Sequence, residues 1–389
     1  MGVYSFAELV FTGGAFMAWG LALWWALRQP KWWYHAWILG LVTLFWWIGE
    51  NIAIRLGKYQ YPNLPFRPHL PFAGTPGYPG KLEHALRALL PAGERLPSEV
   101  LPACAAASWD IPLPVIAIEA ALLFGIFRIA VKLFKSEPGS RVRAALATAG
   151  LSGLLMVNVT AILDPVVSTT MWCEKVLPDP GYHFLNVRLW EWYTTPSHPG
   201  FWYGVPLVNY AAWFLGAAVF AFVARLDDER QSGIIKRYRL ILAYLAATLV
   251  ITAVILLLLI GVKVGVDRVF AYGREAMPLV QGLIGQQQWE FGVMASLLAL
   301  AGIVAWQGRR HHSVRFEAVC FVPKFMVLAF CLGLLVREPH LGIFAIWLLS
   351  FVITIAVRVW PRLAGRGHAD RRLAPPVAPP STGVPGTSA

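Results

Sequence analysis

The chain alternates between long apolar runs and shorter segments rich in charged or turn-forming residues. A helix needs about 20 apolar residues to cross a bilayer, and several runs reach or approach that length. They are Phe6–Leu27, Trp32–Ile54, Ile111–Phe134, Ala144–Ile162, Trp202–Ala224, Leu240–Val262, Trp289–Trp306, Ala318–Leu335 and Leu341–Val359. The pattern predicts an all-α, polytopic bundle of about nine transmembrane helices, of which the last three are slightly short and one can be re-entrant.

The amino-acid composition is typical of a membrane protein and favours anionic lipid over nucleic acid as its binding partner. The chain is 57% hydrophobic and 14% charged, whereas soluble domains average about 45–50% and about 25%. Its 18 tryptophans suit the headgroup regions of a bilayer. Lysine and arginine outnumber acidic residues, 33 to 21, and in so apolar a chain anionic lipid is a better counterpart than nucleic acid. The scattered cysteines and the lack of a Gly-rich phosphate loop, C-x-x-C pair or H-E-x-x-H helix argue against disulfide, nucleotide and zinc sites.

The positions of the basic residues predict an orientation. Arginine and lysine are denser in the loops on the side of the C-terminus, which the positive-inside rule places in the cytoplasm. We therefore expect a multi-pass protein of the cell membrane with its N-terminus outside. The loops divide the chain into an N-terminal span and loop, a repeat-containing catalytic domain, a four-span C-terminal region and a disordered cytoplasmic tail, at residues 1–31, 32–239, 240–360 and 361–389.

The catalytic region contains an internal repeat, formed by spans two and three and again by spans four and five. Each copy has an acid at the outer end of a helix, an aromatic-x-aromatic element in the loop, and an aromatic-x-(Ile/Val)-Pro-Leu start to the next helix. The copies are Glu50, Tyr59-Gln60-Tyr61 and Trp109-Asp110-Ile111-Pro112-Leu113, then Asp164, Trp190-Glu191-Trp192 and Tyr203-Gly204-Val205-Pro206-Leu207. Both run in the same direction across the bilayer, as in a parallel repeat. Pro112 and Pro206 are expected to mark where each return helix begins.

The repeat predicts a site at the non-cytoplasmic ends of these helices, where Glu50, Asp110 and Asp164 are the candidate catalytic acids. A carboxylic acid near hydrocarbon is most stable when neutral, and in that form it can protonate a group that water at pH 7 cannot. Aromatic rings nearby can stabilise a cation by about 0.5–2 kcal/mol each. The candidate substrate-binding residues are Tyr59, Tyr61, Trp109, Trp190, Glu191, Trp192, Tyr203 and Asn209.

The candidate acids also have structural interpretations. Glu50 and Asp164 can cap helix ends or pair with Arg55 or Arg188, although acids within a membrane are functional by default. Asp110 stands at a helix start, where an N-cap role is an alternative to a catalytic one.

Other residues leave similar alternatives open. The Tyr and Trp pairs suit interface anchors, and Asn209 fits an interhelical hydrogen bond as well as a contact with substrate. Glu119, deep in the third span, is either a buried pair partner or part of the site. Lys324 lies within the predicted span Ala318–Leu335, near the turn that contains Glu317. It is expected to extend its amino group towards the membrane surface or to form an ion pair.

In order and spacing, these elements resemble the carotenoid biosynthesis family of membrane proteins, typified by bacterioruberin-type and γ-carotene hydratases. The resemblance extends from the second span through the fifth. It rests on Glu50, Gly57-Lys58-Tyr59-Gln60-Tyr61, Asp164-Pro165, Trp190-Glu191-Trp192 and Tyr203-Gly204-Val205-Pro206-Leu207-Val208-Asn209. The segment between Glu50 and Gly57 is shorter than the family pattern, both external loops are longer, and the C-terminal spans match no pattern of the family.

The resemblance implies a carotenoid hydratase, a hydro-lyase that adds water across the terminal C1=C2 double bond of an acyclic end group without a cofactor or metal. Glu50 or Asp164 would donate the proton, the aromatic rings would shelter the tertiary cation, and a second carboxylate would position or deprotonate the water. The implied partners are a lipophilic polyene that enters from the bilayer, membrane lipids and other enzymes of the carotenoid pathway.

Two other functions use the same parts. In a membrane-bound terpene or lycopene-type cyclase an internal double bond, rather than water, captures the cation, so the product keeps the mass of the substrate. In a non-enzymatic transporter or assembly subunit, intramembrane acids carry protons or bind partners, and such acids are expected at several depths.

Overall fold

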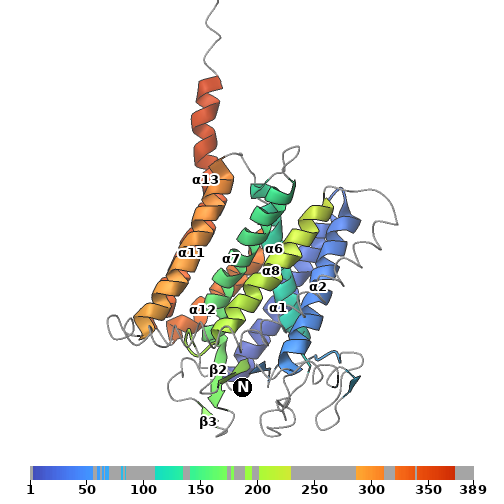
Figure 1. Ribbon diagram of the computed structural model, residues 1–389, viewed down its shortest axis with the longest axis vertical. Coiled ribbons are helices and arrows are strands. Elements are labelled where there is room, and N and C mark those ends of the chain that lie inside the picture. Colours follow the sequence, from blue (N-terminus) through green and yellow to red (C-terminus); the bar gives the residue numbers. More distant parts are fainter. Residues whose placement is uncertain are drawn as a thin grey trace, which may run out of the picture.

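The computed structural model describes most of the helical part of the chain. The described residues are 3–55, 59–61, 64, 66–69, 80–81, 84, 110–134, 141–172, 177–178, 189–194, 201–228, 286–310, 320–337 and 340–372. The helices among them are α1 (Val3–Leu27), α2 (Trp32–Arg55), α6 (Leu113–Leu133), α7 (Arg141–Val167), α8 (Leu207–Asp228), α11 (Gln286–Arg310), α12 (Val322–Arg337) and α13 (Leu341–Arg372). Figure 1 shows them as one bundle with a small sheet at its lower end.

The helices have the length and apolarity of a membrane protein. Six of them (α1, α2, α6, α7, α8 and α11) are long and apolar enough to cross a bilayer, and α12 and α13 contain shorter apolar segments, Val322–Val336 and Leu341–Val357. Each predicted span coincides with one of these helices except Leu240–Val262, which lies outside the described residues. The helical membrane fold is thus confirmed, while the number of spans, the repeat and the orientation stay predictions.

Helix α13 extends into the segment that the sequence predicts to be a disordered tail. The helix continues to Arg372, beyond Pro361, where the sequence predicts that the disordered extension begins. The remaining residues, 373–389, lie outside the part of the chain that the structure describes.

Two central helices, α6 and α7, are buried along most of their length, whereas α1 and α11 expose most of their apolar surface. Exposed side chains on α1 include Phe6, Leu9 and Trp24, as expected for a helix that faces lipid. A helix buried on all sides is normally apolar all round, yet α7 buries Asn158, Thr160 and Asp164. Polar groups at these positions need partners inside the bundle.

The chain also forms a four-stranded sheet, which the prediction of an all-α fold did not include. Its strands are β1 (Tyr59–Gln60), β2 (Ser168–Trp172), β3 (Leu177–Pro178) and β4 (Trp190–Thr194), in the order β1-β4-β2-β3. Strand β4 pairs in antiparallel fashion with β1, with Tyr59 opposite Trp192, and in parallel with β2, with Ser168 opposite Trp190. Because successive side chains of a strand point to opposite faces, each aromatic-x-aromatic element places both rings on one face.

The return helices begin where the prolines predicted. Helix α6 starts at Leu113, directly after Pro112, and α8 starts at Leu207, directly after Pro206. The segment before α6 is also fixed by a side-chain hydrogen bond from α2. Ile111 N donates to Asn51 Oδ1 at 3.3 Å, which ties the start of the α6 segment to the last turn of α2.

Pro165 lies inside α7 and changes its hydrogen bonding. Proline has no N–H, so the carbonyl of Ala161 loses the partner that it would have in a regular helix. The indole nitrogen of Trp202 donates to this carbonyl at 2.8 Å, and Trp202 is only 1% exposed. The loop before α8 thereby supplies the hydrogen bond that the proline removes from α7.

Helices α7 and α8 approach closely at Gly153. A Cβ atom at this position would lie 2.8 Å from the carbonyl oxygen of Phe214 and 2.6 Å from its ring. We expect Gly153→Ala to lower the free energy of unfolding by about 1–3 kcal/mol, because the added methyl group must push α8 away. Thermal unfolding of the purified protein in detergent measures this effect. Gly150→Ala is the matched control on the same helix, since nothing lies within 4 Å of its Cβ position; equal melting temperatures for the two variants would contradict the packing.

Candidate active site

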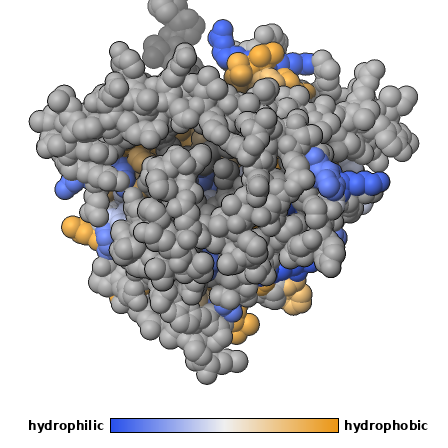
Figure 2. Space-filling model, turned by 60° about the horizontal axis from the view of Figure 1, so that its bottom comes forward, coloured by the Kyte–Doolittle hydropathy of each residue, from blue (hydrophilic) through white to orange (hydrophobic). Residues whose placement is uncertain are grey.

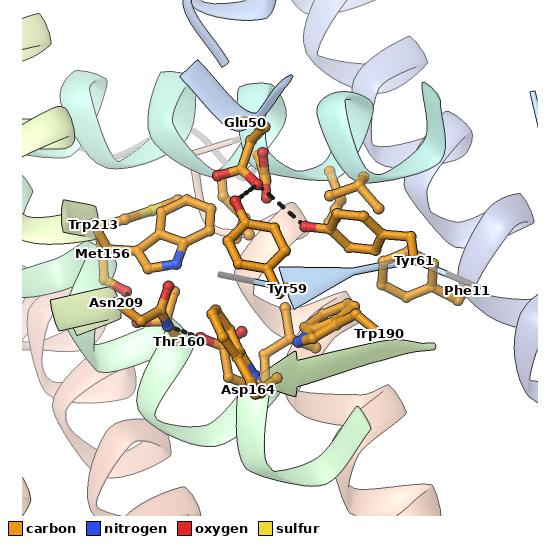
Figure 3. Close-up of a pocket in the computed structure, with 16 residues that line it drawn as sticks. Phe11, Glu50, Tyr59, Tyr61, Met156, Thr160, Asp164, Trp190, Asn209 and Trp213 are labelled. Carbon is orange, nitrogen blue, oxygen red and sulfur yellow. Dashed lines mark hydrogen bonds between the residues drawn. The ribbon is translucent and has the colours of Figure 1, made fainter. Parts of the chain in front are cut away.

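A small cavity lies between the lower helix ends and the sheet (Figure 3). Three carboxylic acids line it, Glu50 from α2, Glu119 from α6 and Asp164 from α7, and they are 7%, 4% and 2% exposed. The other lining residues are Phe11, Tyr59, Tyr61, Val115, Ile118, Leu122, Met156, Thr160, Leu163, Trp190, Trp192, Asn209 and Trp213. The cavity therefore combines acids with aromatic and aliphatic walls.

The surface beyond the sheet is seen in Figure 2, which brings the lower end of the molecule forward. The described residues that reach this surface include both hydrophilic and hydrophobic ones. Phe66 is 65% exposed, whereas Tyr59 and Tyr61 of the cavity are only 6% and 4% exposed. The acids thus lie beneath this surface and not on it.

Glu50 accepts two hydrogen bonds from the β1 segment. The hydroxyl groups of Tyr59 and Tyr61 both donate to Glu50 Oε2, the second at 3.2 Å (Figure 3). Burial, and next the negative charge of Glu50, raise the pKa of both phenols well above 10. The two phenols therefore stay protonated at neutral pH and remain donors, which favours the charged form of Glu50 over that of an acid without such donors.

Asp164 is held between α7 and α8. Asn209 Nδ2 donates to Asp164 Oδ2 at 2.5 Å, and the hydroxyl of Ser168 donates to the Asp164 carbonyl at 2.6 Å. Asn209 thus makes an interhelical hydrogen bond and lines the cavity at the same time, so the two roles that the sequence left open are compatible. The Asp164 carboxylate accepts one side-chain hydrogen bond, whereas the Glu50 carboxylate accepts two.

Glu119, whose role the sequence did not decide, lies in the same cavity as Glu50 and Asp164. Its Oε2 atom is buried and has no hydrogen-bond partner among the described residues. Within that part of the chain, no basic side chain forms a salt bridge with any of the three acids. Three neighbouring acids in a buried site cannot all carry a charge, so at least one of them holds a proton.

Aromatic rings from both loops form one wall. The ring centroids of Tyr59 and Trp192 are 4.7 Å apart, those of Tyr61 and Trp190 are 5.7 Å apart, and Phe11 of α1 lies 6.1 Å from Trp190. The Trp192 indole nitrogen is buried without a partner in the described structure. The wall can stabilise a cation through its ring faces and can offer one hydrogen-bond donor.

Asp110 lies away from these acids. It forms a salt bridge with Arg55 at 3.1 Å and contacts His69 Nδ1 at 3.0 Å, and it does not line the cavity. Arg55 therefore pairs with Asp110 and not with Glu50 or Asp164, the pairings that the sequence suggested. This ion pair connects the last turn of α2 to the segment before α6.

We expect Asp110→Asn to affect stability more than catalysis. The Arg55 side chain is 0% exposed, and removal of a carboxylate that pairs with a buried charge costs up to about 3 kcal/mol. The melting temperature should fall, while turnover per folded molecule stays within about tenfold of the wild type, since less than 1.4 kcal/mol of barrier is at stake. An unchanged melting temperature with loss of turnover would instead make Asp110 a catalytic group.

The remaining predicted substrate-binding residues are placed differently. Tyr203 contacts His340 through a 2.9 Å hydrogen bond between Oη and Nδ1, outside the cavity lining. Burial raises the pKa of Tyr203 to about 12 and lowers that of His340, so the phenol is the donor. Glu191, between the two tryptophans of β4, is buried and does not line the cavity. Trp109 and Arg188 lie outside the described residues.

Sequence reasoning did not identify Phe11, Thr160 and Trp213 as lining residues. A signal was present for two of them, because residues four apart lie on one face of a helix. Thr160 is one turn before Asp164 on α7, and Trp213 is one turn after Asn209 on α8. Phe11 has no such signal, since only the packing of α1 brings it to the site.

Part of this chain is similar to a known family of proteins. Residues 111–273 match the family described as carotenoid biosynthesis protein. This part of the chain is similar to that family. The matched segment includes Glu119, Asp164 and Asn209, while Glu50 and the β1 tyrosines precede it. No curated protein and no solved structure matches the chain.

The match confirms the resemblance found in the sequence and supports a role in carotenoid biosynthesis.

Proposed function

We propose that this carotenoid biosynthesis protein is a hydratase that adds water across the terminal C1=C2 double bond of an acyclic carotenoid end group. The observation that carries the proposal is the grouping of three buried acids with different hydrogen-bond partners in one aromatic-walled cavity. Hydration of such an alkene requires a proton donor, shelter for a tertiary cation and an acceptor for a proton of water. The cavity contains a candidate for each role.

Asp164 is the proposed proton donor. A donor must be neutral before the reaction and tolerable as an anion afterwards, and Asn209 stabilises the Asp164 anion through its 2.5 Å hydrogen bond. Glu119 is less suitable because its Oε2 has no donor among the described residues to support a negative charge. Glu50 is less suitable because its two phenol donors favour the charged form from the start.

Glu50 is the proposed proton acceptor. Asp164 transfers its proton to C2, which leaves a tertiary cation at C1, and the oxygen of water then forms a bond to C1. Glu50 takes the surplus proton from that water, and return of one proton from Glu50 to Asp164 restores the starting state. The two acids divide the work because their hydrogen-bond partners differ.

The water and the cation have candidate sites in the same cavity. Glu119 Oε2 is a buried acceptor and Trp192 Nε1 a buried donor, both without partners in the described part of the chain. A water molecule uses one of each, and a buried water normally makes about three hydrogen bonds. The rings of Tyr59, Tyr61, Trp190 and Trp192 would stabilise the cation by about 0.5–2 kcal/mol each.

Expression in hosts that make lycopene or γ-carotene, followed by mass spectrometry of the pigments, tests this function. We expect a product heavier by one water, with the oxygen labelled when the membranes are incubated in heavy-oxygen water. A product of unchanged mass and altered retention time would favour the cyclase. Pigments unchanged in both mass and retention would remove the basis for either enzyme.

The membrane setting follows from the same proposal. The polyene enters from the bilayer, and the C-terminus lies in the cytoplasm, which places the cavity towards the outer side of the cell membrane. Because the lining acids are nearly fully buried, the aromatic wall or the neighbouring helices must move to admit an end group.

A further inference from the structure

Helix α1 contributes one side chain, that of Phe11, to the lining of the candidate active site. In Figure 3, Phe11 and Trp213 lie at opposite ends of the cavity. The ring of Phe11 contacts Trp190, and it also contacts Phe330 of α12, with ring centroids 5.9 Å apart. Phe11 is only 5% exposed, whereas Phe330 is partly buried and does not line the cavity. A single phenylalanine therefore separates the cavity from the junction of α1 and α12.

The junction of α1 and α12 is built from apolar contacts. Besides the pair of Phe11 and Phe330, a Cβ atom at Gly14 would lie 3.7 Å from Met326 Cε. Gly14 lies about one turn from Phe11, and Met326 one turn from Phe330, so the two contacts form a continuous line, the α1–α12 seam. Val10, the next side chain around α1, is 41% exposed. The seam therefore borders the lipid.

The face of α1 that packs into the bundle consists largely of alanines. These buried alanines are Ala7, Ala15, Ala18, Ala22 and Ala26. Phe11 interrupts the series at the level of the cavity. Because separating alanines exposes less apolar area than separating larger side chains, α1 can shift at a lower cost than α6 or α7, which are buried along most of their length.

The other walls of the cavity are held by hydrogen bonds. The phenols of the β1 segment donate to Glu50, and Asn209 of α8 donates to Asp164 of α7. Helix α1 is also joined to α2, since Trp19 Nε1 donates to Thr43 Oγ1 at 3.1 Å. Opening the cavity at any of these walls breaks a buried hydrogen bond. Separation of Phe11 from Phe330 breaks only an apolar contact.

We propose that the α1–α12 seam opens to bind the polyene chain of the substrate, while the end group takes the place of the Phe11 ring beside the acids. The seam is closed in the structure, so α1 must move away from α12 before the chain can enter. This inference rests on the proposed function for the identity of the substrate. A seam that borders lipid leaves the rest of the apolar chain in the bilayer, so the protein encloses only the end group.

Cross-linking of the seam tests the proposal in the full-length protein with its four cysteines replaced by alanine. Gly14→Cys and Met326→Cys are joined by a short bifunctional thiosulfonate reagent, whose link a reductant breaks. Asp164→Asn is added so that lycopene binds without conversion. The lycopene that stays with the protein through purification in detergent is then measured. We expect the linked protein to retain about tenfold less lycopene than the reduced protein, since burial of two carbon groups of the chain is worth that factor. Lycopene bound first should slow the linking.

The matched control links α1 to α2 instead, through Trp19→Cys and Thr43→Cys, and should retain lycopene with or without the link. Phe330→Ala provides a second test that needs no cysteines. It removes the ring that contacts Phe11 from α12, so lycopene uptake should become about 2–10-fold faster, the factor that one aromatic pair contributes. Phe344→Ala removes an aromatic contact of α13 with Trp347 outside the seam and should leave uptake unchanged.

The results that would overturn the proposal are specific. Equal retention of lycopene by the linked and reduced proteins would do so, as would loss of retention in the α1–α2 control or a failure of every protein to retain the pigment. Failure of the proposed hydratase function has a different signature. Wild-type membranes would then leave the mass of the pigment unchanged, while the linked and reduced proteins would still differ in the lycopene that they retain.

Discussion

Replacement of Asp164 by asparagine is expected to abolish hydration while the protein remains folded and inserted in the membrane. The carboxamide has the size of the acid and can still accept a hydrogen bond from Asn209, but it cannot donate a proton to C2. Removal of a general acid lowers the rate by about 100–10,000-fold. Turnover of the acyclic carotenoid, measured per folded molecule, should therefore fall below detection in a pigment assay.

The chemically matched control for this variant is Asp110→Asn. The same substitution is then made on an acid that lies outside the cavity, in the salt bridge with Arg55. The expected contrast is loss of turnover at position 164 and loss of stability at position 110. Near-normal turnover in Asp164→Asn would assign the proton donor elsewhere, with Glu119 as the next candidate in the cavity.

Replacement of Glu50 by glutamine is expected to change the product as well as the rate. In this variant Asp164 can still protonate C2, but Glu50 no longer takes the proton of the attacking water. The cation at C1 should then return a proton from a neighbouring carbon to the Asp164 carboxylate, which gives an isomerised alkene. We expect loss of the hydrated pigment by about 100-fold or more, together with products of unchanged mass and shifted retention time.

This outcome separates the two acids, because Asp164→Asn should give neither hydrated nor isomerised pigment. Tyr59→Phe is a graded companion to Glu50→Gln, since it removes one of the two phenol donors and leaves the carboxylate in place. Its product mixture should lie between those of the wild type and Glu50→Gln. Identical product mixtures from the Glu50 and Asp164 variants would contradict the division of roles.

Much of the candidate site was predictable because its signals are local. Glu50 and Asp164 each end an apolar run, and the aromatic pairs that follow them have a spacing of two. Pro112 and Pro206 stand directly before the helices that they were expected to start. Such features need no knowledge of tertiary contacts, only of helix length and the conformational preferences of proline.

The remaining features depend on contacts between distant segments. Strand β1 is only two residues long and pairs with β4 far along the chain, so alternation over so short a segment could not predict the sheet. The direction in which Glu119 and Asp110 face is set by packing of α6 against its neighbours, and a linear pattern does not contain it. The buried start of α12 likewise depends on the close approach of Cys320 to Gly125.

The hydrogen bond from Trp202 to the Ala161 carbonyl makes two separated sequence motifs interdependent. The Asp-Pro pair leaves a carbonyl without a donor, and the aromatic segment before α8 supplies that donor. In a chain with alanine at position 165 the backbone N–H would return, and the indole of Trp202 would lose its function. Substitutions at these two positions should therefore be strongly non-additive. The helix turn that carries the proposed proton donor and the entry to the next helix are therefore coupled through this one hydrogen bond.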